Sequence, residues 1–243
     1  MDFQLSEEQT AIQERARSLA RAGMLPQAEE GDGEMIVPVE ALRAAAALGL
    51  AGIYCQEEHG GSGLGRLDST IIFEELASAC PSTAAYISIH NMCAAMIDKF
   101  GAEGLRAKYL PKALNMEMFF SYCLTEPGSG SDAAALKTKA VKSNTAYSLP
   151  GTKAFISGGG YSDAYIIMAR TDDDSPKGIT ALIVEDGTQG LSFGCLEDKM
   201  GWRSQPTRQV QLDDCKTPIE NLLGEEGRGF SYAMAGLDGG RLN

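Results

Sequence analysis

Apolar side chains recur at intervals of three and four residues through most of the first 115 positions, which is the period of an amphipathic helix. The run from Ser6 to Gln9 has the form of a capping box, so a helix is expected to start there. Gly23 and Pro26 are expected to close it. The same period predicts further helices over residues 38–48, 67–79, 82–100 and 103–114.

The pattern changes at Met116, where short runs of aromatic and β-branched residues begin, separated by Gly, Pro, Asn and Asp. Strands are expected around residues 119–124 and over 137–142, 146–149, 153–157, 164–170, 179–185, 191–196 and 208–212. Their spacing of about ten residues favours an antiparallel barrel or sandwich over alternating strands and helices. A helical pattern returns after Pro218 and reaches Asn243 without a cap.

These patterns predict an α+β multidomain protein. An N-terminal all-α domain is expected over residues 1–115 and an antiparallel β-barrel or sandwich domain over 116–226. Residues 227–243 are expected to begin a third, helical domain, the rest of which is absent.

Charge and composition remove several classes of partner. The 243 residues are 44% hydrophobic and carry a formal net charge of -12, which repels nucleic-acid phosphates and anionic membranes. Neither a membrane span nor a secretory or transit leader is expected. The chain is therefore expected in a bacterial cytoplasm or, as a processed form, in the mitochondrial matrix. Six cysteines without a C-x-x-C pair and two histidines predict free thiols and no metal.

The segment YCLTEPGSGSD, Tyr122 to Asp132, is the most informative for chemistry. It leaves a strand and enters a loop in which Gly128, Ser129 and Gly130 leave the backbone uncovered. Such a loop can direct several N–H groups at an anion, so a negatively charged protein can hold a pyrophosphate without lysines. For the GSGS run alone, an ordinary turn between strands is the commoner interpretation.

Several motifs in fixed order extend this signal over almost the whole chain. They are LSEEQ, EEHGGSGLG, YCLTEPGSGSD, TKAFIS, MGWRSQPTR, DCKTP, NLLGEEGRGF and LDGGR. Together they resemble the acyl-CoA dehydrogenase family. The resemblance implies helical, β-barrel and four-helix-bundle domains, usually assembled as a homotetramer. It also implies α,β-dehydrogenation of an acyl-CoA, with FAD taking the hydride and an electron-transferring flavoprotein receiving the electrons.

The resemblance also assigns site residues. The cofactor-binding positions it implies are Tyr122, Cys123, Leu124, Thr125, Gly130, Ser131, Phe155, Ile156 and Ser157. The substrate-binding positions are Ser131, which FAD and acyl-CoA share, and Asp238, Gly239, Gly240 and Arg241. Strand alternation is expected to turn the Cys123 side chain into the barrel core. Many relatives have Trp where Phe155 stands. His90 and Trp202 are expected to be structural.

The segments over residues 82–94 and 204–208 are most similar to the isobutyryl-CoA branch of the family, which acts in valine breakdown; other short or branched acyl groups remain open. No residue matches the family's catalytic glutamate, which is expected in the missing C-terminal region. The chain alone is therefore expected to be inactive. Two other readings stay open: a non-catalytic module that binds flavin or CoA, and an acyl-CoA oxidase that uses oxygen directly.

Overall fold

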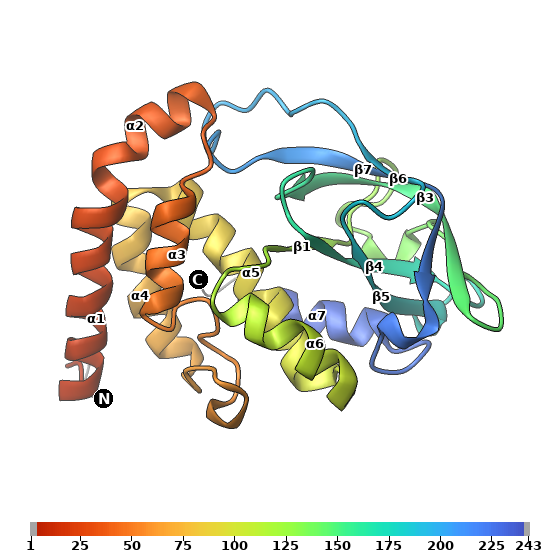
Figure 1. Cartoon of the computed structure of the whole chain (residues 1–243), viewed down its shortest axis with the longest axis horizontal. Coiled ribbons are helices and arrows are strands. Elements are labelled where there is room, and N and C mark those ends of the chain that lie inside the picture. The colour runs from red at the N-terminus through yellow and green to blue at the C-terminus, as the bar shows by residue number, and fades with distance from the viewer. Residues whose placement is uncertain (1–3, 241–243) are drawn as a thin grey trace.

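The computed structural model describes residues 4–240, in which helices precede two β-sheets (Figure 1). The helices of the first part are α1 (Glu7–Leu19), α2 (Leu25–Glu34), α3 (Val39–Ala47), α4 (Arg66–Ala79), α5 (Pro81–Phe100) and α6 (Glu103–Leu114). The capping box expected at Ser6 is present, with Gln9 as its second member. The α+β class predicted from the sequence is confirmed.

The expected end of the first helix at Gly23 and Pro26 is wrong. A π-helical turn over Ala20–Met24 carries the chain from α1 directly into α2. Pro26 lies in the first turn of α2 and has no N–H to donate to the preceding turn, and the wider π-helical turn lies directly before it. Leu19 and Met24 are buried on either side of Gly23, so packing keeps this glycine helical.

The strands form two four-stranded sheets. They are β1 (Phe120–Cys123), β2 (Val141–Lys142), β3 (Ala146–Ser157), β4 (Ala164–Arg170), β5 (Ile179–Glu185), β6 (Leu191–Phe193), β7 (Thr207–Pro218) and β8 (Leu222–Leu223). Their orders are β1-β4-β5-β8 and β2-β3-β7-β6. The strand-rich unit is thus a pair of open sheets, looser than the expected barrel. The pair β1–β4 is parallel, because the connection through β2 and β3 is long enough to return the chain in the same direction.

The first sheet is covered on both faces. Tyr165 and Ile167 of β4 join the core shared with the second sheet. Their neighbours Ile166 and Met168 join the core shared with α5 and α6. Successive side chains of a strand point to opposite faces, so covering both faces buries all seven residues of β4.

Strand β3 joins two runs that the sequence pattern separates. It continues through Pro150 and Gly151, and its register with β7 shifts there and again between Lys153 and Ile156. The second shift is a bulge that contains Phe155, whose φ of 57° is left-handed. The sheet therefore bends where β3 approaches β1.

Helix α7 (Gly229–Gly240) packs against α5 and β5 and completes the described chain (Figure 1). Gly229 begins it at the sheet surface, where an added Cβ would lie 2.6 Å from the carbonyl carbon of Thr180. In residues 4–240 no helix combines the length and the hydropathy that a membrane span requires.

His90 predicts a loss of stability in mild acid. Its Nδ1 accepts from the Phe120 N–H at 3.2 Å, and its Nε2 donates to the Ala113 carbonyl at 2.8 Å. Burial lowers the pKa of His90 from 6.5 to about 4. Between these pH values the imidazole is protonated in the unfolded chain and neutral in the folded chain. Stability should therefore fall as the pH drops from about 6.5 to about 4, by roughly 2 kcal/mol between pH 7 and pH 5. Urea unfolding at both pH values measures this. A His90→Gln variant should lose that part of the pH dependence, and an unchanged dependence would contradict the assignment.

Gly158 predicts a second sensitive position, directly after β3. Its φ is +76°, and an added Cβ would lie 2.4 Å from Ser121 Oγ and 2.5 Å from Ser162 Oγ, two hydroxyls already bonded to each other at 2.7 Å. Gly158→Ala should therefore destabilise the fold by roughly 2 kcal/mol or more, measured as a lower Tm. The control is Gly128→Ala, where an added Cβ meets no atom within 4 Å. Equal Tm values for the two variants would refute this reasoning.

Candidate functional site

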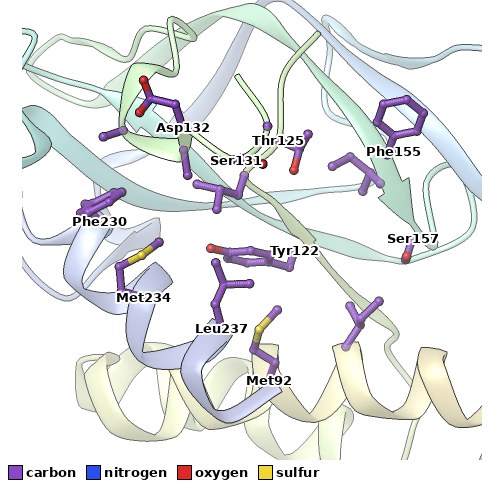
Figure 2. A pocket seen from close by; sticks show the side chains of 16 residues that line it. Met92, Tyr122, Thr125, Ser131, Asp132, Phe155, Ser157, Phe230, Met234 and Leu237 are labelled. Atoms are coloured by element: carbon purple, nitrogen blue, oxygen red, sulfur yellow. The ribbon is translucent and has the colours of Figure 1, made fainter. Parts of the chain in front are cut away.

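A cavity of about 440 Å³ opens where the loop after β1, strand β3 and helices α5 and α7 meet. It gathers eight of the nine cofactor positions expected from the sequence: Tyr122, Leu124, Thr125, Gly130, Ser131, Phe155, Ile156 and Ser157. Figure 2 shows Tyr122 between the loop residues Thr125 and Ser131 on one side and Leu237 and Met92 on the other. Residues separated by more than a hundred positions thus share one surface.

Strand alternation decides which side chains of β1 reach this cavity. Tyr122 and Leu124 line it, whereas Cys123 is fully buried in the core between the sheets. Only the main chain of Cys123 is therefore available to a ligand. The Tyr122 hydroxyl is buried and has no hydrogen-bond partner within residues 4–240. Burial raises the pKa of Tyr122 well above its ordinary value, so the hydroxyl stays protonated and can donate.

The loop after β1 exposes its backbone at the two glycines. An added Cβ at Gly128 or Gly130 would meet no atom within 4 Å. Ser129 differs from the expectation because it is buried, donating its N–H to the Glu126 carbonyl and its hydroxyl to the Asp132 carbonyl. Ser131 is exposed and lines the cavity. The open backbone therefore flanks Ser129 rather than including it.

The β3 bulge forms the opposite wall. Phe155 is 66% exposed although it is aromatic, and its left-handed backbone turns it out of the sheet. Ile156 and Ser157 continue this wall. An exposed aromatic ring beside the cavity offers a flat apolar surface to a planar ligand.

The substrate positions expected on helix α7 do not line this cavity, as far as the structure describes them. Its cavity wall consists of Phe230, Met234 and Leu237. Asp238 is exposed and outside the cavity lining, and Gly240 lines a separate cavity between α4 and α5. Gly239 is buried against Arg66, and Arg241 lies outside the described residues.

Arg66 explains the glycine at position 239. An added Cβ there would lie 2.1 Å from the guanidinium carbon of Arg66, which itself lies 3.8 Å from the centre of the Tyr54 ring. An added side chain at position 239 would therefore have to displace the guanidinium from the Tyr54 ring.

Part of the apolar lining was not predicted from the sequence; it comes from Ile89, Met92, Ala133, Ala134, Phe230, Met234 and Leu237. On α5 and α7 their helical spacing is the same as that of core residues, so the pattern carried no signal that they face a cavity. Asp132 is the one carboxylate among the lining residues, and Figure 2 shows its carboxyl group directed away from Tyr122. The lining is otherwise uncharged and offers amides, hydroxyls and apolar surface.

A buried ion pair lies behind this cavity. The ammonium of Lys153, which is fully buried, lies 2.8 Å from Glu126 Oε1 and 3.1 Å from the Leu124 carbonyl. Burial lowers the pKa of Lys153, and Glu126 opposes that shift. For Glu126, burial opposes ionisation but the attraction of Lys153 and its hydrogen bonds prevail, so its pKa lies below the ordinary value. The carboxylate therefore stays ionised at neutral pH.

Comparisons with known proteins place the chain among named families. The family profile "Acyl-CoA dehydrogenase, N-terminal domain" matches residues 6–117, and "Acyl-CoA dehydrogenase, middle domain" matches residues 121–215. The mitochondrial isobutyryl-CoA dehydrogenase of Bos taurus is 54% identical over 239 residues, and that of Dictyostelium discoideum is 55% identical over 240. Each alignment covers 98% of this chain, which spans 58% of the length of either relative.

Solved structures share the fold over nearly the whole chain. Butyryl-CoA dehydrogenase from Megasphaera elsdenii has a TM-score of 0.92 at 38% identity, covering 99% of this chain and 64% of that one. A structure of PigA with FAD and proline has a TM-score of 0.94 at 29% identity, covering 98% and 63%. Two domain profiles in order, close relatives and shared folds lead to one conclusion: the chain belongs to the acyl-CoA dehydrogenase family.

Proposed function

We propose that this chain forms the flavin-binding part of an enzyme that dehydrogenates a short branched-chain acyl-CoA, such as isobutyryl-CoA, with FAD. The observation that carries the proposal is the cavity in which Tyr122, Thr125, Ser131, Phe155 and Ser157 converge. The similarity to two isobutyryl-CoA dehydrogenases supports the acyl group. We further propose an electron-transferring flavoprotein as the acceptor and a homotetramer as the assembly, in a bacterial cytoplasm or the mitochondrial matrix.

The lining fits an FAD. Bound there, FAD would supply the hydride acceptor. Tyr122, Leu124 and Thr125 would lie along the ring, and Phe155 would pack beside it. The hydroxyls of Thr125 and Ser157 and the buried Tyr122 hydroxyl supply donors. Gly130 and Ser131 would face the pyrophosphate with backbone dipoles, which suits a protein of net charge -12.

The substrate would meet both polar and apolar groups. Ser131 would contact FAD and acyl-CoA together. The acyl group would lie against Met92 and the α7 side chains Met234 and Leu237, which are apolar and adaptable. Asp238 to Arg241 would contact the CoA moiety. One methyl more or less in such a pocket changes binding by about 1–3 kcal/mol.

The proton-removing glutamate of the family has no counterpart in the cavity lining. We propose that it lies in the part of the relatives' length that this chain does not span. We also propose the division into residues 1–115, 116–226 and 227–243 as helical, sheet and bundle domains.

Because no glutamate among residues 4–240 lines the cavity, anaerobic isobutyryl-CoA should leave flavin bound to this chain oxidised. Bleaching of the flavin would contradict the proposal. In the full-length protein, peroxide release without an added acceptor would identify an oxidase instead.

FAD binding is the first testable consequence. Titrating FAD with the chain should quench flavin fluorescence, and Gly130→Val should weaken the Kd by about tenfold or more because its side chain covers the open backbone. The control is Gly201→Val, since Gly201 has equally open surroundings. Both variants should keep the wild-type Tm. No quenching by wild type, or equal Kd values for the two variants, would contradict the assigned site.

Tyr122 provides a test that separates binding from folding. Its hydroxyl has no partner among residues 4–240, so Tyr122→Phe should leave the free energy of unfolding unchanged or raise it by up to about 1–3 kcal/mol, seen as an equal or higher Tm. If the hydroxyl serves a ligand, the same change should weaken FAD or acyl-CoA binding. Tyr109→Phe is the control: the Tyr109 hydroxyl donates to Glu185 at 2.7 Å, so its loss should lower the Tm without changing ligand binding. A Tyr122→Phe variant that melts lower and binds normally would count against a ligand role.

A further inference from the structure

Lys153 and Glu126 do not line the candidate FAD cavity. They do connect two of its walls, the segment after β1 and the β3 bulge. The Thr125 carbonyl accepts the Ala154 N–H at 2.9 Å, which joins the segment after β1 to the β3 bulge. Lys153 adds its bond to Leu124 at the same junction. The remaining capacity of Glu126 is taken by the Lys137 N–H at 2.6 Å and the Thr138 N–H at 2.9 Å. The pair therefore connects the segment after β1, β3 and the returning chain.

The bond from Lys153 to Leu124 also determines where the next N–H points. The Leu124 carbonyl and the Thr125 N–H belong to one planar trans peptide unit, in which these two groups point in opposite directions. Since the carbonyl points at the buried ammonium, the N–H points away from it. Within residues 4–240 the Thr125 N–H has no acceptor, and Thr125 lines the cavity.

The ammonium also changes the strength of that donor. A hydrogen bond from a charged group to a carbonyl polarises the peptide unit, and the low dielectric of a buried site strengthens this effect. Lys153 is fully buried, so water does not screen it. Buried ion pairs are weak contributors to stability, so its placement behind a ligand-facing peptide calls for another role.

We propose that Lys153 is a positioning residue for the flavin. Through the Leu124–Thr125 peptide it aims the Thr125 N–H into the cavity and makes it a stronger donor to the pyrimidine edge, which gains negative charge on reduction. Glu126 keeps the ammonium charged and fixes the loop. This inference rests on the proposed FAD site.

The test replaces Lys153 with Met, which keeps length and removes charge. FAD should bind Lys153→Met about tenfold more weakly, because the Thr125 N–H is then less polarised and less firmly directed into the cavity. The midpoint potential of the remaining bound flavin should shift to more negative values, because the reduced form loses its polarised donor. In the ligand-free protein, the amide resonance of Thr125 should move. Lys139→Met removes the same charge from an exposed side chain and should change none of these.

A second variant separates positioning from folding. Lys153→Met leaves Glu126 unpaired, so the double variant Lys153→Met/Glu126→Gln removes both charges and should recover part of the lost Tm. Recovery is partial because the Gln amide nitrogen cannot accept one of the two backbone N–H groups that Glu126 binds. Its potential and its Thr125 resonance should stay shifted from those of the wild type. A folded single or double variant with wild-type Kd, potential and Thr125 resonance would overturn the inference, as would a lower Tm as the sole change. Failure of the wild-type chain to bind FAD would instead refute the proposed function itself.

Discussion

The whole site depends on the first sheet being covered on both faces. With the second sheet on one side and helices on the other, a one-residue slip of a central strand would exchange the side chains packed in the two layers, which differ in size and shape. This fixes the register of β1 beside β4, and with it the alternation that turns Tyr122 to the cavity and Cys123 to the core. The chemistry at the sheet edge is therefore set by packing in the sheet centre.

Strands that are marked by a continuous apolar run between turn residues could be predicted from the sequence. The bounds of β4 and β5 match the expected ranges, because each is an unbroken apolar run between turn residues. The union of two runs into β3 was not predictable, since Pro150 and Gly151 read locally as a break and only pairing with β7 carries the strand through them. The parallel pairing of β1 is likewise a property of the tertiary structure.

The same division applies to the candidate site. The motif residues from Tyr122 to Ser131 and from Phe155 to Ser157 meet as the resemblance implied, although their roles remain proposals. Ser129 turned inward because its loop satisfies its own polar groups, which a Gly/Ser composition does not reveal. The role proposed for Lys153 could not be predicted either, because its sequence neighbours do not show that its ammonium donates to the Leu124 carbonyl in the segment after β1.

The contact between Gly239 and Arg66 has a consequence for interpreting inherited or engineered variation. Gly239 belongs to the segment that we propose contacts CoA, so a missense change there would ordinarily be interpreted as a loss of substrate recognition. Any larger residue would also displace the guanidinium that stacks on Tyr54 and so remove a contact between α7 and the N-terminal helices. The effect of such a variant would combine altered packing with any change in ligand binding, and only a stability measurement beside a binding measurement would separate the two.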